Sequence, residues 1–508
     1  MSTQLAKHTL LVSSATLLSR ILGFLRDLCL ATLLGAGPGA DAFFVAFRIP
    51  NLLRRLFAEG SLSMAFVPVF SQLKIKSKNK AFILARSLQL WIIIILSALV
   101  GLGFMASHTL IALIAPGFVQ KPELFQLTVH LTQICLPYII FISCVALYTG
   151  ILNCFNYFFL PALAPCILNL SMIGAALFGY FLHLPVHYCL AYGVLLAGLL
   201  QVLSQWPGLT KIGFSLWGEV KLISPELKKI LFLTLPTVFG AAIYQVNMLA
   251  ITFMASFLAQ GSISYLYYAD RLVQFPLGVF GIAIGTAALP ALSSLIAQNK
   301  ILEAEKTLGM ALNLNLFITL PASAGLLGLA QPIISLLFGH GAFTPNDVNQ
   351  TALALAAYTL GLPAFALTKT LVSCFYALKN TKIPVIASCI SMVVNIVAGF
   401  ILMKYLQHVG LALAVSLSSW LNIGLLIYYL KKRLKIRLDF KENLMCISLS
   451  LLILISTKWS SRFNLLGLIS IPAGIIGYLA LSYALKLPSG LLLLSSVAKK
   501  KIGKTPTT

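Results

Sequence analysis

Acidic side chains are rare in this chain. Its 508 residues include only 12 Asp and Glu, and charged residues of both signs make up 9% of the total, against 59% hydrophobic residues. No polar stretch is long enough to form a separate soluble domain. This composition excludes an ordinary soluble enzyme and is typical of a chain that crosses a membrane many times.

Motifs for familiar catalytic chemistry are missing as well. The 7 histidines show no H-E-x-x-H or other metal-ligand spacing, and there is no G-x-x-x-x-G-K-[ST] phosphate loop. The 9 cysteines are scattered and form no C-x-x-C pair, so we interpret them as packing residues. We therefore predict a protein that is not an enzyme and holds no metal or other cofactor. Coupling of its activity to an ion or to the membrane potential stays open.

Apolar runs recur along the whole chain, and each is about as long as a bilayer-spanning helix requires. They predict an all-α polytopic membrane protein with fourteen spans, near residues 9–34, 40–70, 82–107, 127–152, 160–182, 187–207, 228–258, 264–297, 307–337, 348–377, 383–403, 409–430, 444–460 and 464–486. The first could imitate a signal peptide, but Arg20 interrupts it and no A-x-A-like cleavage site follows, which favours an uncleaved span.

The net charge of +24 invites a nucleic-acid interpretation, which the distribution of the charges opposes. If the amino terminus is cytoplasmic and the spans alternate, 25 of the 36 lysines and arginines fall on the cytoplasmic side, 7 fall inside spans and 4 in outer loops. Such asymmetry follows the positive-inside rule. We expect a cytoplasmic membrane protein with both termini in the cytoplasm, and no nucleic-acid partner.

Two similar halves are suggested by recurring features. Gly60-Ser61 and Pro68 follow the charged stretch of the first half, and Gly285-Thr286 and Pro290 follow that of the second. The alternative is chance recurrence of Gly, Pro and Ser. We predict an N-lobe over 1–207 with spans 1–6, a cytoplasmic amphipathic linker over 208–228 that includes a short surface helix, a C-lobe over 229–430 with spans 7–12, and a C-terminal helix pair with a basic tail over 431–508. Parallel repeats of this kind place a transporter's substrate at their interface.

Charged residues inside apolar segments mark the candidate site, because a charge near the bilayer centre costs roughly 2.5–3.5 kcal/mol on insertion scales. The acids are Asp27, Asp41, Glu59 and Asp270, and the cations are Arg20, Arg26, Arg48, Arg54, Arg55, Arg271 and Lys369. On a helical wheel Arg20 shares a face with Asp27 while Arg26 lies off it. The wheel favours Arg55 over Arg54, but Pro50 can kink that helix and reverse the choice.

Cations outnumber acids in this set, whereas a purely structural ion network should be close to neutral. The excess fits a cavity that binds a lipid-borne anion such as a diphosphate, because guanidinium groups bind phosphate oxygens in bidentate fashion. The alternative is that single arginines extend to the membrane interface. For Lys369 the structural and functional interpretations are balanced.

Long segments of the chain resemble the MurJ (MviN) family of lipid II flippases. They are SRILGFLRD (19–27), GADAFFVAFRIPNLLRRLFAEG (39–60), AFVPVFSQ (65–72), APGF (115–118), LPALAPCILNLSMIG (160–174) and SYLYYADRLVQFPLGVFGIAIGTAALP (264–290). The similarity covers nearly the whole chain and is weakest after about residue 440.

This resemblance implies a transporter of the multidrug/oligosaccharidyl-lipid/polysaccharide exporter superfamily. Its members have fourteen helices, with two lobes in a V shape around a central cavity and a final helix pair that forms a groove for the lipid tail. They move the undecaprenyl-diphosphate-linked peptidoglycan precursor, lipid II, from the inner to the outer leaflet of the bacterial inner membrane. For this chain we expect transport by alternating access and function as a monomer. The family's essential arginines match Arg20, Arg26, Arg54 and Arg271, with Arg48 and Arg55 nearby, and its acidic charge partners match Asp27, Asp41, Glu59 and Asp270. The resemblance thus favours Arg54 over Arg55.

Three other functions remain as alternatives. An exporter of another polyprenyl-diphosphate oligosaccharide would share the same cationic site. A drug/cation antiporter of the superfamily predicts an anionic cavity, and a membrane-embedded sugar-phosphate enzyme predicts a cluster of carboxylates at one interface.

Overall fold

The computed structural model describes residues 3–54, 61–461 and 469–492, among which no β-strand occurs. The helices are α1 (Thr3–Leu34), α2 (Pro38–Leu53), α3 (Ser61–Lys76), α4 (Lys78–Met105), α5 (Ser107–Ile114), α6 (Pro122–Cys135), α7 (Tyr138–Cys154), α8 (Phe159–Phe181), α9 (Val186–Lys211), α10 (Pro225–Ser256), α11 (Ser262–Pro276), α12 (Ile282–Ala297), α13 (Ile301–Gly328), α14 (Ala330–Phe338), α15 (Pro345–Thr359), α16 (Leu362–Ala377), α17 (Lys382–Leu430), α18 (Phe440–Ser460) and α19 (Ser470–Ala484). Two short turns, η2 (Pro116–Phe118) and the π-helical η3 (Leu277–Gly281), join neighbouring helices.

Eight helices within the described ranges are long and apolar enough to cross a membrane, or nine if the bent pair α15 and α16 forms one span. The predicted spans 383–403 and 409–430 both lie in α17, which a non-helical backbone at Gln407, with φ 51° and ψ −132°, divides into two helical parts. Its 49 residues would reach about 74 Å as a straight helix, more than twice the hydrocarbon thickness. The all-α polytopic class is confirmed, and the number of fourteen spans stays a prediction.

Contacts along the chain divide it into two compact units. Unit 1 comprises Met1–Ser264 with His340–Thr344, and unit 2 comprises Tyr265–Gly339 with Pro345–Thr508. Helix α10 packs against α3, α4, α5 and η2, which places it in unit 1, whereas the repeat pattern assigns most of it to the second lobe. The lobe boundaries drawn from the repeat stay a prediction.

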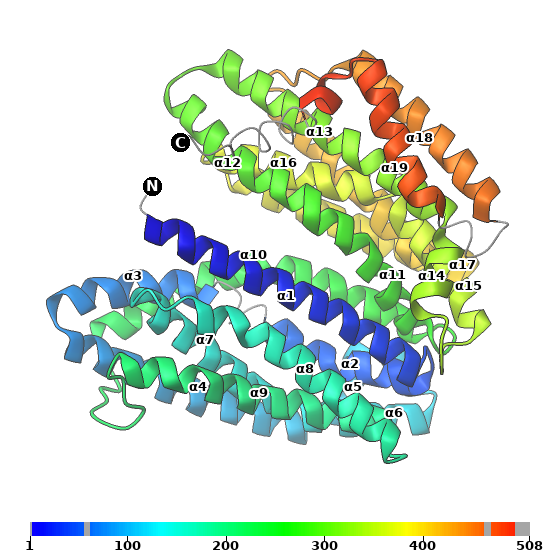
Figure 1. The fold of residues 1–508 in the computed structure, drawn as a ribbon. Coiled ribbons are helices and arrows are strands. Elements are labelled where there is room, and N and C mark those ends of the chain that lie inside the picture. The colour runs from blue at the N-terminus through cyan, green and yellow to red at the C-terminus, as the bar shows by residue number, and fades with distance from the viewer. Residues whose placement is uncertain (1–2, 55–60, 462–468, 493–508) are drawn as a thin grey trace, which may run out of the picture. The chain divides into compact units, whose positions relative to one another are not determined.

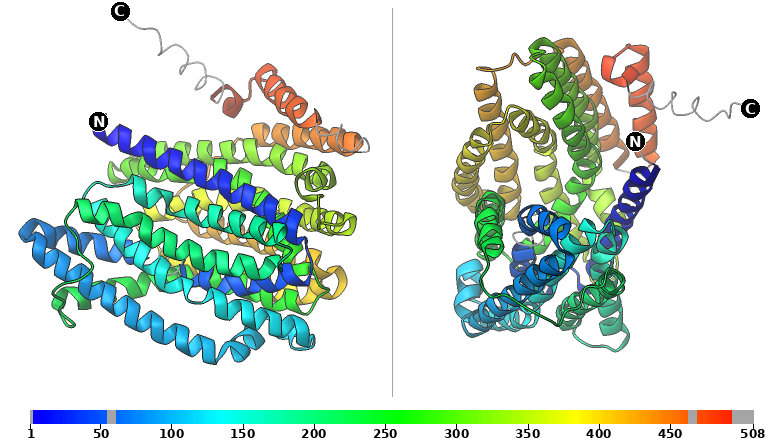
Figure 2. Two further views of the ribbon diagram at one scale, coloured as in Figure 1. Left: turned by 60° about the horizontal axis from the view of Figure 1, so that its bottom comes forward. Right: turned by 90° about the vertical axis from the view of Figure 1, so that its left-hand side faces the viewer.

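Unit 1 is organised around helices that run side by side. Helix α8 packs along both α1 and α9, α2 packs on α6, and α3 packs on α4, α7 and α10 (Figures 1 and 2). One apolar core joins α3, α4, α7 and the end of α9, with Phe66, Phe70 and Leu147 fully buried in it. The contacts of α1 with α8 and of α2 with α6 fix the positions of these two helices, which carry five of the eleven candidate charges.

Unit 2 has two cores that share α13. Residues of α12, α13, α16 and α17 form the larger one, and Phe317 of α13 forms the smaller one with α18 and α19. The Tyr478 hydroxyl donates to the Phe317 carbonyl oxygen at 2.8 Å, and the two rings lie 4.9 Å apart. The C-terminal helix pair is therefore joined to α13.

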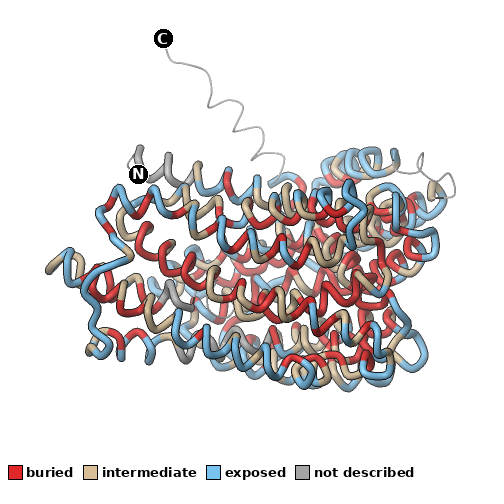
Figure 3. Tube along the Cα trace, turned by 90° about the horizontal axis from the view of Figure 1, so that it is seen from below, coloured by how far each residue is buried: buried red, intermediate tan, exposed pale blue. Residues whose placement is uncertain are grey.

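Burial follows the helical turn, so that buried and exposed positions alternate around most helices (Figure 3). Helix α4 exposes a row of large apolar side chains that includes Ile94, Ile95 and Leu102, and only 11% of its most apolar window is buried. A continuous row of exposed, large apolar side chains is typical of contact with lipid.

The segment between α9 and α10 contains no helix over residues 212–224. The prediction of a short surface helix in this segment is therefore wrong. Three side chains of α4 hold the segment extended: Arg86 and the Trp91 indole donate to the Trp217 and Leu222 carbonyl oxygens, and the Ser87 hydroxyl accepts from Lys221 N–H. These bonds satisfy backbone groups that a helix would otherwise pair internally.

Candidate functional site

The Arg26 guanidinium is buried in unit 1, between α1 and α8. Its Nη2 lies 2.6 Å from Asp27 Oδ1 and its Nε 3.1 Å from the same oxygen, while Nη1 donates to Asn169 Oδ1 at 3.1 Å. Asn169 in turn donates to the Ser19 carbonyl oxygen at 3.1 Å. Arg26 is 5% exposed and Asp27 is 1% exposed. In this state the pair and the Asn169 amide together join α1 to α8.

Arg20 has a different environment from Arg26, although both lie on α1. Its side chain is exposed, and among the described residues no carboxylate lies within ion-pair distance of it. The helical wheel grouped Asp27 with Arg20, but Asp27 forms its ion pair with Arg26. Helix α8 covers the later turns of α1 and brings the neighbouring pair into its interface.

The Asp41 carboxylate, 1% exposed, binds the start of α11. It accepts hydrogen bonds from Gly261 N–H at 2.6 Å, from Ser264 N–H at 2.9 Å and from the Ser264 hydroxyl at 2.6 Å. All three donors belong to unit 1. A carboxylate at a helix N-terminus satisfies free N–H groups and interacts favourably with the helix dipole. Asp41 therefore acts here as the cap of α11.

Arg48 and Arg54 of the second predicted span each donate to an oxygen atom of a neutral group. Arg48 donates from Nη1 to the Met248 carbonyl oxygen of α10 at 2.9 Å. Arg54 donates from Nε and Nη2 to Asn51 Oδ1 at 3.1 and 2.9 Å. Both side chains are half-buried. Arg55 and Glu59, which the sequence also predicts as site residues, lie outside the described residues.

Unit 2 contributes Asp270 and Arg271 from α11. Arg271 donates from Nη2 to the Tyr267 hydroxyl at 3.2 Å, and its guanidinium lies 5.2 Å from the centre of the same ring. Asp270 accepts from Gln274 Nε2 at 3.2 Å. Both contacts run between residues four apart, which share one face of a helix. Tyr267 thus orients the Arg271 guanidinium.

Sequence reasoning missed two residues that hold side chains of α1 and α11. Asn169 holds Arg26, and the buried Asp347 accepts a hydrogen bond of 2.7 Å from the Tyr265 hydroxyl. Asn169 could have been found as an amide inside an apolar run, since such residues bridge membrane helices. Lys369 is exposed on α16, and its backbone lies against Gly285 of α12. Within the described ranges, no three His, Cys, Asp or Glu side chains gather closely enough to hold a metal ion.

Comparison with known proteins decides the family. Residues 30–489 match the protein family described as Lipid II flippase MurJ. The chain belongs to this family. The probable lipid II flippase MurJ of Buchnera aphidicola subsp. Acyrthosiphon pisum (strain APS) is 39% identical over 453 residues, which cover 89% of this chain and 88% of that protein.

Solved structures agree with the assignment to the MurJ family. A structure titled Lipid II flippase MurJ, inward closed conformation, superposes with a TM-score of 0.82 at 32% identity, covering 94% of this chain and 98% of the other. An inward-facing multidrug resistance MATE family transporter of the MOP superfamily has a TM-score of 0.66 at 15% identity, covering 84% of this chain and 99% of the other. The second match shows a common fold alone.

Proposed function

We propose that this chain is a lipid II flippase, which moves the undecaprenyl-diphosphate-linked peptidoglycan precursor from the inner to the outer leaflet of the bacterial inner membrane. Membership of the MurJ family over most of the chain supports this function. The proposal describes a transporter that leaves its substrate chemically unchanged. Its partners are the lipid-linked precursor and the bilayer, and it works as a monomer.

The observation that carries the proposal is the excess of cations inside apolar helices. Seven cations against four acids leave a positive balance in these segments. A diphosphate restores the balance and supplies oxygen atoms for the guanidinium groups. We assign Arg20, Arg48, Arg54, Arg55 and Arg271 to the binding of the diphosphate and head group. Arg26 joins them when its bonds to Asp27 and Asn169 open.

Transport proceeds by alternating access in this proposal. The fourteen spans leave both termini in the cytoplasm, and the two lobes rock about glycine and proline positions such as Gly23, Pro50 and Gly278. Moving one charge across the field is worth about 2.3 kcal/mol per 100 mV. The membrane potential therefore has enough energy to return an empty cationic site to the inner side.

The deciding experiment replaces single arginines in a strain that depends on this chain. With Arg20→Ala or Arg271→Ala, we expect the precursor to accumulate in the inner leaflet while the protein is still inserted at normal levels. The matched control is Lys404→Ala, which removes a cation from a predicted outer loop and should leave exposure of the precursor unchanged. A normal amount of precursor at the outer leaflet in both arginine variants would refute the phosphate site.

A drug/cation antiporter is separated from the flippase by ligand protection of the purified protein. A ligand that binds only the folded state raises its stability according to its concentration and affinity. We expect polyprenyl diphosphate to raise the unfolding temperature and organic cations to leave it unchanged. The opposite result would favour the antiporter.

A further inference from the structure

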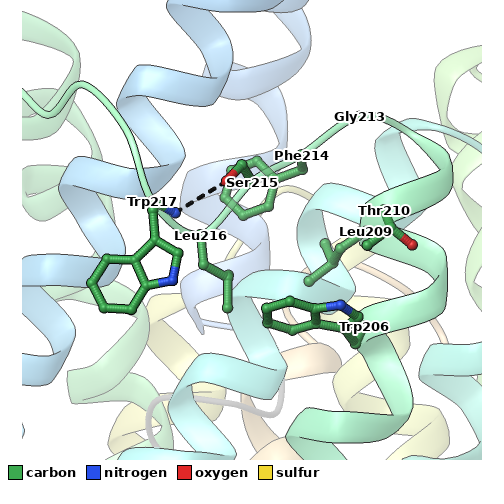
Figure 4. Close-up of a pocket in the computed structure, with 8 residues that line it drawn as sticks. All are labelled: Trp206, Leu209, Thr210, Gly213, Phe214, Ser215, Leu216 and Trp217. Carbon is green, nitrogen blue, oxygen red and sulfur yellow. Dashed lines mark hydrogen bonds between the residues drawn. The ribbon is translucent and has the colours of Figure 1, made fainter.

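A pocket of about 300 Å³ lies where α9 meets the segment that follows it. Trp206, Leu209 and Thr210 line it from the last turns of α9, and residues 213–217 line it from the segment. The Leu216 side chain is directed toward the indole of Trp206 (Figure 4). The pocket lies wholly within unit 1, and none of the candidate charged residues lines it.

The end of α9 is built to hold this pocket open. Gly213, with φ +78°, donates its N–H to the Thr210 carbonyl oxygen at 2.9 Å, and Phe214 N–H donates to the Leu209 carbonyl oxygen at 2.9 Å. This pair of bonds is the Schellman motif, which ends a helix and turns the chain back along it. Phe214 is buried in the core beside Leu209, so residues 215–217 are carried over the surface.

Large apolar side chains around the pocket are left exposed. Trp217 is 84% exposed and Trp206 44%, and further along the segment Ile223 is 77% exposed. A third tryptophan, Trp91, contacts the same segment, because its indole donates to the Leu222 carbonyl oxygen at 2.8 Å. Three of the chain's five tryptophans therefore lie on or beside the segment that follows α9. Tryptophans gather at the boundary between the bilayer and water, where the ring contacts lipid and the N–H stays hydrogen-bonded.

Cations flank the same surface. Lys78 Nζ lies 3.8 Å from the position that a side-chain carbon on Gly213 would occupy, and the Arg86 guanidinium lies against Gly218 and donates to the Trp217 carbonyl oxygen at 3.1 Å. Arg86 Nε is buried and has no hydrogen-bond partner among the described residues. Residues 74–86 and 206–229 together carry nine lysines and arginines against Glu219 and Glu226.

We propose that this pocket is a binding site for an anionic phospholipid of the cytoplasmic leaflet. The lipid phosphate lies between Lys78 and Arg86, and an acyl chain covers Trp206, Leu216 and Trp217. Charge complementarity selects an anionic lipid, since each cation near an anionic leaflet contributes about 1 kcal/mol. Lys78 and Arg86 are predicted to lie on the cytoplasmic side, which places the pocket at the cytoplasmic leaflet. The inference does not depend on which substrate the protein transports.

The first test measures lipid retention by the purified full chain in native mass spectrometry, with phosphatidylglycerol and phosphatidylcholine as probes. We expect phosphatidylglycerol to be retained preferentially, and Lys78→Gln to weaken its binding about fivefold. The exposed Lys78 ammonium lies 5.5 Å from the ring centre of Phe82 and 5.7 Å from that of Phe155. Lys78→Gln removes both contacts, so its thermal unfolding is compared with that of the parent and should be unchanged. Lys404→Gln removes an exposed lysine elsewhere and should bind as the unmodified chain does. Equal retention of the two lipids, or equal loss in the two variants, would overturn the proposal.

The second test locates the lipid. In vesicles of phosphatidylcholine with about one third brominated phosphatidylglycerol, we expect quenching of the tryptophan fluorescence that falls when Trp217→Phe removes the most exposed indole of the pocket. Brominated phosphatidylcholine should quench less at the same fraction. If neither lipid quenches Trp217, the surface binds something other than a phospholipid, such as a protein, and the inference is wrong.

Discussion

Replacing Arg26 tests whether this buried arginine serves packing, substrate binding or both. Arg26→Ala removes the guanidinium that lies 2.6 Å from the Asp27 carboxylate, which is 1% exposed. Removal of one member of a buried pair costs about 3–5 kcal/mol, because the remaining charge is uncompensated. The lost bond to Asn169 adds about 1 kcal/mol. We therefore expect a loss of unfolding free energy of about 4–6 kcal/mol.

The matched variant removes both charges at once. Arg26→Met combined with Asp27→Asn keeps similar volumes, and such replacement of a buried pair is often neutral for stability. Detergent-purified protein is compared in thermal unfolding, and the same variants are assayed for precursor exposure at the outer leaflet. We expect the double variant to be stable and inactive, because it folds but lacks the phosphate-binding group. A stable and fully active double variant would show that Arg26 has a packing role alone, and an Arg26→Ala variant as stable as the parent would refute the energetic reasoning.

Three further substitutions have definite expected outcomes. Asp41→Asn should lower the unfolding free energy by about 2–3 kcal/mol, because an amide cannot accept all three hydrogen bonds at the start of α11; unchanged thermal unfolding would contradict the capping role. Gly117→Ala should lower the unfolding free energy by about 3 kcal/mol or more, because its new methyl group would overlap the backbone at the end of α10. Gly101→Ala, with nothing within 4 Å, serves as the control and should be neutral or stabilising. Tyr267→Phe keeps the ring beside Arg271 and removes the hydroxyl, so precursor exposure should fall by no more than about tenfold, whereas a complete loss would give the hydroxyl a role beyond orientation.

The positions of the helices could be predicted from the apolar runs. Apolar runs of bilayer length must pair their backbone groups internally, so each predicted span is largely helical in its described residues. The break at Gln407 lies in the connection predicted between the spans 383–403 and 409–430, although no proline marks it. The extended segment 212–224 was mispredicted because its partners lie more than a hundred residues earlier, on α4.

Composition and spacing alone show which charges lie inside apolar helices, because long apolar runs must be helical and the charged residues within them can be read off directly. The sequence alone could not assign their partners. Arg26 pairs with its neighbour Asp27 because α8 supplies Asn169 and excludes water, and Asp41 accepts from Gly261 N–H, 220 residues later along the chain, at the start of α11. A helical wheel describes one helix in isolation, whereas the energy of a buried charge depends on the helix packed against it. Tertiary packing therefore decided which of these charges are bound to the protein and which remain accessible to a ligand.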